Sequence, residues 1–137
     1  RRAGYVQALR RFGLAPDPTL EVGGDFSVIG GRDAMAELLG RDDPPTAVFA
    51  MSDEMAFGAL LAAKERGIDV PGDVSVVGVD DHDLALVVGL TTVRQVVPDH
   101  GSRAARLIVD QLAGLDVPPT RHEGPIELVV RETTAKP

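Results

Sequence analysis

Polar side chains follow three apolar stretches of the chain, each at a point where a strand of an α/β sheet would end. Ser52 and Asp53 come after one stretch, Asp80 and His82 after the next, and Gln95 after the third. The carboxyl ends of parallel strands meet at one edge of a sheet, so groups just beyond them converge on a single crevice. We therefore expect a small-molecule site at this edge.

Two strongly apolar runs, 46–51 and 74–79, predict the strands that position these side chains. Neither run alternates with polar residues, which is typical of parallel strands covered on both faces. Strands that alternate with helical patterns predict right-handed βαβ units and a parallel sheet flanked by helices, an α/β fold. The further expected elements are strands at 90–94 and 126–130, an extended piece near 20–22, and helices at 5–12, 32–39, 55–66, 84–88 and 99–113.

The composition is that of one soluble globular domain with a core of its own. The chain has 137 residues, of which 44% are hydrophobic and 26% are charged. It has no cysteine, which excludes disulfides and thiolate metal sites and fits a reducing cytoplasm. No apolar run approaches the roughly 18 residues of a membrane span. The net charge of −7, without a basic cluster, disfavours direct binding of nucleic acid.

Six short segments spread along nearly the whole chain form a specific series, although each is a weak signal alone. They are RRAGY at 1–5, GDFS at 24–27, PTAVFAMSDEMA at 45–56, VPGDVSVVGVDD at 70–81, LTTVRQ at 90–95 and ELVVRETT at 127–134. In content and order this series resembles the lactose- and galactose-repressor (LacI/GalR-type) family of transcriptional regulators.

The resemblance implies a two-lobed, periplasmic-binding-protein-like sensor domain of type I, which a helix-turn-helix DNA-binding region precedes in the family. Residues 1–94 would form most of the C-terminal lobe, 95–124 would belong to the N-terminal lobe, and 125–137 would return as a strand and tail. The chain opens at Arg1 without a methionine or a helix cap, and we expect it to be a fragment of a longer protein. The helix within 95–124 would then dock on the C-terminal lobe, exchange between protomers or be poorly ordered.

The resemblance also implies roles in binding a small effector. Arg1 matches an arginine that contacts effector hydroxyls or carboxylates, Asp80 matches an effector-contacting aspartate, and Phe26 matches an aromatic that stacks on the effector. Ser52 stands where the family commonly has asparagine, and Asp53 could line the crevice. The structural alternatives are a solvated terminal arginine, helix or turn caps for the hydroxyl and the carboxylates, and a core phenylalanine.

His82 is a further candidate, because an imidazole can hydrogen-bond a ligand and titrates near neutrality. His100 and His122 lie far from it in the sequence and show no zinc-ligand spacing, so we expect no metal. Asp81 is expected to be structural and to bond nearby backbone amides.

The helix at 55–66 is apolar on nearly all sides, which predicts burial against its own sheet and against another subunit. The resemblance places a two-fold homodimer interface in this region. The matching residues are Met55, Ala56, Phe57, Ala59 and Leu60. A buried core helix is the alternative, and both can hold for different faces.

We interpret the chain as the ligand-sensing part of a cytoplasmic transcriptional regulator or repressor. A sugar, a nucleoside or a small acid would bind between two lobes and shift their arrangement. Operator DNA would be contacted only through a region that this chain lacks, and no membrane is involved. The alternative is a solute-binding module of the periplasmic-binding-protein type, against which the apolar helix at 55–66 argues.

An enzyme is not expected. Asp80 and Asp81 are neighbours at a strand end and would point in different directions, and no set of nucleophile, base and orienting group is visible. The chain is accordingly expected to use no cofactor.

Overall fold

The sheet at the centre of the structure has four strands and is mixed. The computed structural model describes residues 1–95, 97–118 and 124–136. The strands are β1 (Ala47–Phe49), β2 (Ser75–Asp80), β3 (Thr91–Gln95) and β4 (Ile126–Val129), in the spatial order β1-β2-β3-β4. The first three run parallel, as predicted, whereas β4 is antiparallel to β3.

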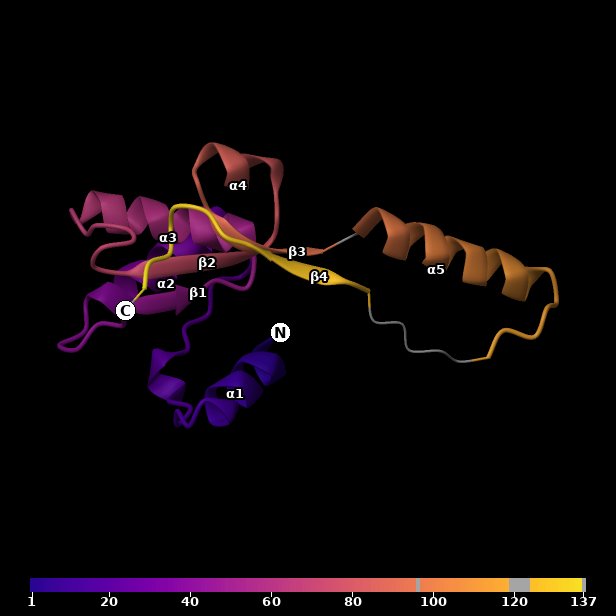
Figure 1. Ribbon diagram of the computed structural model, residues 1–137, viewed down its shortest axis with the longest axis horizontal. Coiled ribbons are helices and arrows are strands. Elements are labelled where there is room, and N and C mark those ends of the chain that lie inside the picture. The colour runs from indigo at the N-terminus through magenta and orange to yellow at the C-terminus, as the bar shows by residue number, and fades with distance from the viewer. Residues whose placement is uncertain (96, 119–123, 137) are drawn as a thin grey trace.

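The direction of β4 corrects the expectation of a sheet that is parallel throughout. β3 leads toward α5 (Val97–Leu112), which lies beyond the carboxyl ends of the strands and projects away from the rest of the chain (Figure 1). The chain re-enters the sheet from that same edge. β4 therefore runs in the opposite direction to its neighbour.

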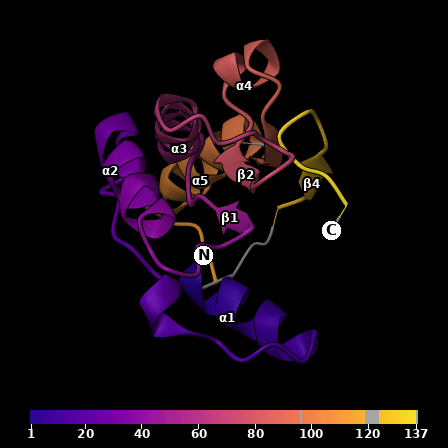
Figure 2. The same ribbon diagram turned by 90° about the vertical axis from the view of Figure 1, so that its left-hand side faces the viewer.

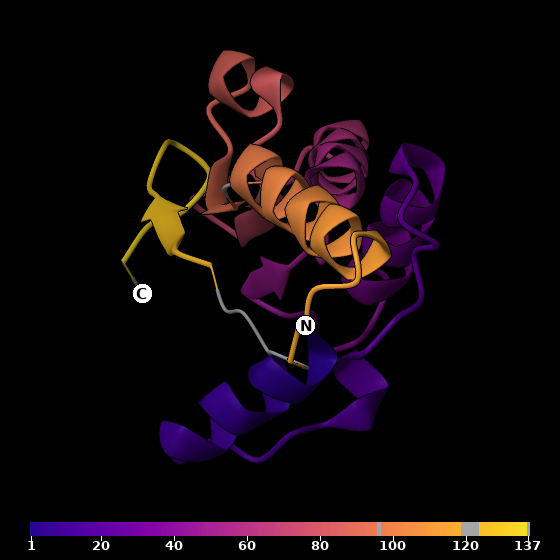
Figure 3. The ribbon, with the colours of Figure 1, turned by 90° about the vertical axis from the view of Figure 1, so that its right-hand side faces the viewer.

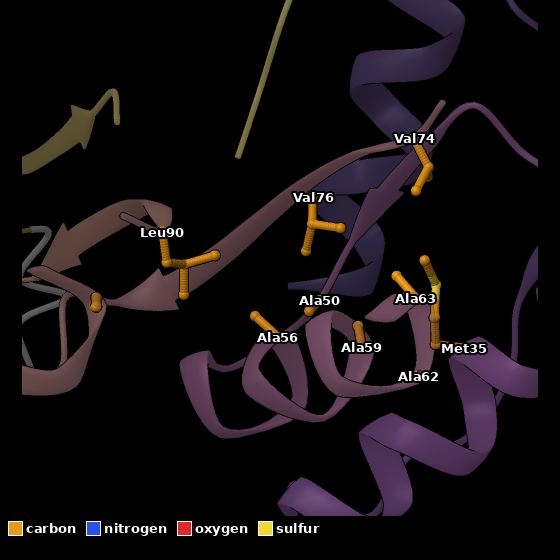
Figure 4. Close-up of a cluster of buried hydrophobic side chains, with 10 residues drawn as sticks. Met35, Ala50, Ala56, Ala59, Ala62, Ala63, Val74, Val76 and Leu90 are labelled. Carbon is orange, nitrogen blue, oxygen red and sulfur yellow. The ribbon is translucent and has the colours of Figure 1, made fainter. Parts of the chain in front are cut away.

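Helices α2 (Val28–Leu39) and α3 (Asp53–Glu65) lie beside each other on one side of the sheet (Figure 2). The core lies between α3, the strands and α2, and apart from Met35 its side chains are small or branched (Figure 4). Its members are Met35, Ala50, Ala56, Ala59, Ala62, Ala63, Val74, Val76, Ala85 and Leu90. The four alanines on one face of α3 let this helix lie close to the strands.

Helix α1 (Arg2–Arg11) attaches to the opposite face of the sheet, near β1. The ring of Tyr5 stacks on that of Phe49 with their centroids 6.2 Å apart. Val48 packs into the core, and successive side chains of a strand point to opposite faces. Phe49 therefore lies on the face away from α3. No residue of α1 is buried.

Two elements differ from the sequence prediction. The second helix begins at Val28 instead of residue 32, because the hydroxyl of Ser27 caps it by accepting a hydrogen bond from a backbone amide of the first turn (2.9 Å). The extended piece predicted near 20–22 is not a strand. A 3-10 helix spans Pro18–Leu20, and the side chain of Asp17 caps it.

Gly58 sets how closely α3 can approach α2. A Cβ atom at this position would lie 1.9 Å from the carbonyl oxygen of Val28 and 2.5 Å from the backbone nitrogen of Arg32. Both atoms belong to the backbone of α2, so neither can give way by a change of rotamer. Only glycine allows the two helices to pack at this separation.

The C-terminal tail joins β2 to β3 at their amino ends. Thr133 is buried, and its hydroxyl accepts a hydrogen bond from the amide of Thr91 (2.9 Å) and donates one to the carbonyl of Val76 (2.7 Å). The amide of Val76 donates in turn to the carbonyl of Thr133 (2.8 Å). β2 pairs with β3 only from Val77 onward. At Val76, the residue before it, the tail takes the position that β3 would otherwise fill.

Asp81, just after the carboxyl end of β2, binds the tail through Arg131. Arg131 donates to its Oδ1 (2.6 Å) and Arg94 to its Oδ2 (2.7 Å). This corrects the expectation that Asp81 bonds backbone amides, because its partners are two guanidinium groups. Burial is the largest influence and raises the pKa of the Asp81 carboxyl. The hydrogen bonds and charges of Arg131 and Arg94 together outweigh it and hold that pKa below its ordinary value.

Among the described residues, helix α5 extends away from the sheet and the other helices (Figure 1) and lies in front of them in Figure 3. Docking on the rest of the chain, the first of the three outcomes expected for this helix, is therefore not what the structure shows. Several of its large apolar side chains are exposed, and Leu112 keeps 83% of its surface open. The other exposed members of this stretch are Ile108, Val109 and Leu115.

None of the helices in the described residues is both long enough and apolar enough to cross a membrane. Within these same ranges, no group of three or more histidine, cysteine or acidic side chains is placed to hold a metal ion.

Replacing Gly58 with alanine should destabilise the protein although alanine favours helices by about 1 kcal/mol over glycine. The added methyl group must push α3 away from α2, and such overpacking costs roughly 1–3 kcal/mol. Urea unfolding of Gly58→Ala measures the loss. Gly4→Ala in α1 is the control, because nothing lies within 4 Å of its added Cβ. A Gly58→Ala protein as stable as Gly4→Ala would contradict the close packing.

Replacing Asp81 with asparagine should cost roughly 1.5–3 kcal/mol at pH 7, because charge-assisted hydrogen bonds to two arginines are weakened. A carboxyl whose pKa is lowered by folding stabilises the fold above its unfolded pKa, about 3.9, and this contribution is lost as the pH falls through the folded value. Urea unfolding at pH 7, 5, 4 and 3 should show the two proteins converging below about pH 4. Asp42→Asn, in an exposed loop, is the control. A difference that stays constant with pH would refute this account.

Candidate ligand-binding site

Three segments that are distant in the sequence meet at the carboxyl edge of the sheet. Asp80 ends β2, and its Oδ1 accepts hydrogen bonds from Arg1 Nη2 (2.7 Å) and from Gln95 Nε2 (2.5 Å). Arg1 also donates through Nη1 to the carbonyl oxygen of Met51, just after β1. The convergence that strand ends predict is therefore present for Asp80 and Gln95, and Arg1 joins them from the start of the chain.

The second carboxylate oxygen of Asp80 is the feature that makes this edge a candidate binding site. Among the described residues, none donates a hydrogen bond to Oδ2, and the side chain keeps 35% of its surface exposed. An ionised carboxylate accepts hydrogen bonds only. Asp80 therefore offers a fixed acceptor, which a hydroxyl or amide of a bound molecule can use.

The turn that carries this acceptor has a strained backbone. The φ angle is 119° at Asp80 and 55° at Asp81, in the left-handed half of conformational space that residues with a Cβ rarely adopt. Such conformations cost on the order of 1–3 kcal/mol each and persist only where the surroundings enforce them. The enforcing contacts include a hydrogen bond from the amide of Asp81 to the hydroxyl of Thr92 (3.3 Å).

Asp53 supports this turn from inside the protein. It is fully buried, its Oδ1 accepts from the hydroxyl of Thr92 (2.6 Å), and its Oδ2 accepts from the amide of His82 (2.7 Å). A Cβ atom at Gly78 would lie 2.2 Å from Asp53 Oδ1, so β2 needs glycine there to admit the carboxyl group. This placement corrects the expectation that Asp53 lines the crevice.

Ser52 and His82 both cap helices. Ser52 is buried, and its hydroxyl accepts a hydrogen bond from the amide of Met55 (3.2 Å) at the start of α3. His82 is exposed, and its Nδ1 accepts from the amide of Leu84 (3.1 Å) at the start of α4 (Asp83–Val87). The imidazole also meets the ring of Phe57 edge-on, with centroids 5.8 Å apart. The contacts of His82 are thus with α3 and α4.

Phe26 is exposed, so the alternative of a core phenylalanine is not what the structure shows. It keeps 61% of its surface open and has a φ angle of 61°, after a φ of 45° at Asp25. Asp25 Oδ1 accepts from the amide (3.1 Å) and the hydroxyl (2.6 Å) of Ser27, which fixes the turn. In the described part of the chain, no hydrogen bond or ring stacking joins Phe26 to Arg1 or Asp80.

Two residues that support the turn, Thr92 and Arg131, are not predicted from the sequence. Thr92 is the second of two adjacent threonines at the start of β3, both of them buried, and buried hydroxyls of this kind require partners. Arg131 lies just after the last strand, and its second guanidinium nitrogen donates to the carbonyl of Leu90 (2.7 Å). Buried threonine pairs could have signalled the first residue, whereas no local signal marks the second.

The expected interface residues of α3 divide into two groups. Ala56, with 0% of its surface exposed, and Ala59 face the core, so they are corrected to core residues. Met55 is half-buried. Phe57 and Leu60 line a shallow hollow of about 340 Å³ on the other side of the helix. Its further lining residues are Leu61, Lys64, Val70, Val88, Glu132 and Thr133.

The comparison with known protein families agrees with this architecture. Residues 1–134 match a family described as a periplasmic binding protein-like domain. The transcriptional repressor CytR of Escherichia coli K12 is 43% identical over 136 residues, which are 98% of this chain and 40% of CytR. The regulator CelR of Thermobifida fusca is 41% identical over 135 residues, 97% of this chain and 40% of CelR. The chain thus spans about 40% of the length of these relatives.

Solved structures show the same fold. A complex of the transcriptional regulator CelR with cellobiose superposes with a TM-score of 0.89 at 41% identity, covering 95% of this chain and 40% of that one. A LacI family regulator from Enterococcus faecium with bound ribose superposes with a TM-score of 0.84 at 31% identity, covering 96% and 49%. The chain is thus similar to part of LacI family transcriptional regulators, and it belongs to the periplasmic binding protein-like family.

Proposed function

We propose that this chain forms one wall of an effector site that binds an uncharged, polyhydroxylated molecule, a sugar or the ribose of a nucleoside. The observation that carries the proposal is the Asp80 carboxylate, which Arg1 and Gln95 hold through one oxygen while the other stays open. One carboxylate can accept hydrogen bonds from hydroxyls of a sugar ring. The exposed ring of Phe26 suits the C–H face of such a ring.

The charges at this edge favour a neutral ligand over a small acid. The positive charge of Arg1 is already paired with Asp80 at 2.7 Å. A ligand carboxylate beside Asp80 would meet a like charge and would compete with Asp80 for the charge of Arg1. The solved complexes of the two relatives with cellobiose and with ribose support the same choice.

The opposite wall of the site would come from a second lobe, most of which lies outside this chain. Residues 95–124 would contribute to that lobe, and 1–94 with 125–137 would form this one. The exposed apolar side chains of α5, a helix that lies apart from the sheet (Figure 1), support this division. Effector bound between the lobes would favour one arrangement of them and so change operator binding by a DNA-binding region, in the cytoplasm and with no covalent step.

The competing functions have less support. A solute-binding module would use the same edge of the sheet, but the relatives named above are transcriptional regulators. An enzyme that used the acidic pair as catalyst would need two available carboxylates. Asp81 is occupied at both oxygens by arginines, which leaves only Asp80. We therefore propose a sensor without catalytic activity.

We further propose that the chain pairs with a second copy of itself through an apolar surface of α3 and α4. Leu61 of α3 and Val88 after α4 line the same hollow, which shows that the two helices adjoin there. The neighbouring side chains of α4 are open to solvent, with Leu86 at 73% and Val87 at 76%. A contiguous exposed apolar patch of this kind marks an interaction site.

An effector screen tests the role of Asp80. The thermal unfolding of the chain is measured with cellobiose, D-ribose, uridine and D-gluconate, the last being a polyhydroxylated anion. A bound compound at about 100 times its Kd stabilises the fold by roughly 2.7 kcal/mol. We expect stabilisation by a neutral member of the panel, none by gluconate, and none in Asp80→Ala.

Asp42→Ala, which removes an exposed carboxylate from a loop, is the matched control and should keep the stabilisation. Stabilisation by gluconate alone would reverse the proposed preference for neutral ligands. An Asp80→Ala protein stabilised as much as the wild type would show that binding does not use this carboxylate.

Association of two copies is tested with Val87→Asp. A charge in the centre of the proposed interface should shift the chain from dimer to monomer in sedimentation velocity, with little change in thermal midpoint because the side chain is exposed. Leu112→Asp places the same charge on the exposed apolar face of α5 and should leave the dimer intact. If both variants sediment like the wild type, the surface of α3 and α4 is not the interface.

A further inference from the structure

Two consecutive residues at the end of β3 hold the two consecutive aspartates of the strained turn. Gln95 donates to Asp80 Oδ1 (2.5 Å), and Arg94 donates through Nε to Asp81 Oδ2 (2.7 Å). β3 pairs with β2 in parallel up to the pair of Arg94 with Asp80. The end of β3 thus fixes both the side chain that faces a ligand and the residue after it.

Arg94 also reaches the neighbouring strand on its other side. Its Nη1 donates to Glu127 Oε2 (3.0 Å), and Glu127 is its register partner on β4. A surface pair of this kind alone contributes little, and Glu127 keeps 66% of its side chain exposed. The planar guanidinium, however, is held on two edges by carboxylates of two different elements, which restricts its orientation.

These contacts connect the turn to the strands that lead to α5. β3 and β4 are the only two strands of the described residues that extend toward that helix (Figure 1). The backbone angles of Asp80 and Asp81 are unfavourable without outside support. Arg94 supports the turn and also joins β3 to β4. A change in the turn can therefore alter the pairing of the two strands, and a change in that pairing can alter the turn.

We propose that Arg94 is a positioning residue for the ligand site. It holds the turn in the form that leaves Asp80 Oδ2 open, and it ties that form to the pairing of β3 with β4. The inference rests on the proposed role of Asp80 as a ligand contact. Because coupling between two sites is reciprocal, a ligand bound at Asp80 strengthens the pairing of β3 with β4. Loosening that pairing in turn lowers the affinity for the ligand.

The test first needs no ligand. Arg94→Gln removes the guanidinium and its charge but keeps a polar side chain, and Glu127→Gln removes only the charge of the outer partner of Arg94. Nuclear magnetic resonance reports the side-chain amide signal of Gln95 and the hydrogen exchange of the Asp81 and His82 amides. In Arg94→Gln we expect a shifted Gln95 signal and roughly tenfold faster exchange of the two amides.

Further variants separate positioning from general loss of stability. Arg66→Gln changes an exposed arginine at the far end of α3 and should leave all three signals unchanged. Glu127→Gln should show a smaller effect of the same kind, and it should add nothing in the Arg94→Gln background. Arg94→Lys keeps the positive charge but cannot donate to both carboxylates in the geometry of a guanidinium. Its signals should therefore lie between those of Arg94→Gln and the wild type.

Titration with cellobiose and D-ribose then measures the consequence for binding. The Kd of a sugar that binds the wild type should rise roughly three- to tenfold in Arg94→Gln, with a smaller rise in Glu127→Gln. If neither sugar binds the wild type, the proposed ligand class fails for these sugars, while the exchange data still decide the role of Arg94. Unchanged Gln95 and amide signals in Arg94→Gln, or the same changes in Arg66→Gln, would overturn the inference.

Discussion

The carboxyl edge of the sheet, where the candidate site lies, depends on one buried carboxyl group, that of Asp53. A carboxyl group removed from water must find hydrogen-bond donors in the protein, because leaving it unpaired costs several kcal/mol. The donors are the hydroxyl of Thr92 on β3 and the amide of His82 in the turn after β2. Gly78 provides the space. The first residue of α3 thereby sets the relative position of both neighbouring strands and of the turn that carries Asp80.

The site is organised before any ligand arrives. Asp80 receives hydrogen bonds from the start of α1 and from the end of β3, and its backbone is held in a conformation that it would not adopt alone. The free energy that this arrangement requires comes from folding, so a ligand need not supply it. Pre-organised acceptors bind more tightly than mobile ones because less conformational freedom is lost on binding.

The sequence predicts well what depends on local pattern and poorly what depends on long-range contact. Uniformly apolar runs identify the parallel strands, and the rule of strand ends brings Asp80 and Gln95 together. The burial of Asp53 depends on a threonine 39 residues away, which no local pattern shows. A helix with apolar residues on nearly all sides does not reveal which face meets the sheet, and Ala56 and Ala59 turn out to face the core. The direction of β4 follows from the position of α5, which lies apart from the sheet.

The position of Thr133 near the end of the sequence affects how the protein folds during its synthesis. Thr133 joins β2 and β3 at their amino ends, and it comes after every strand and helix of the described residues in the sequence. A ribosome has therefore synthesised β2 and its neighbours well before their last partner emerges. Until then the nascent lobe carries unpaired strand edges, the form of a folding chain that chaperones recognise and that aggregates most readily.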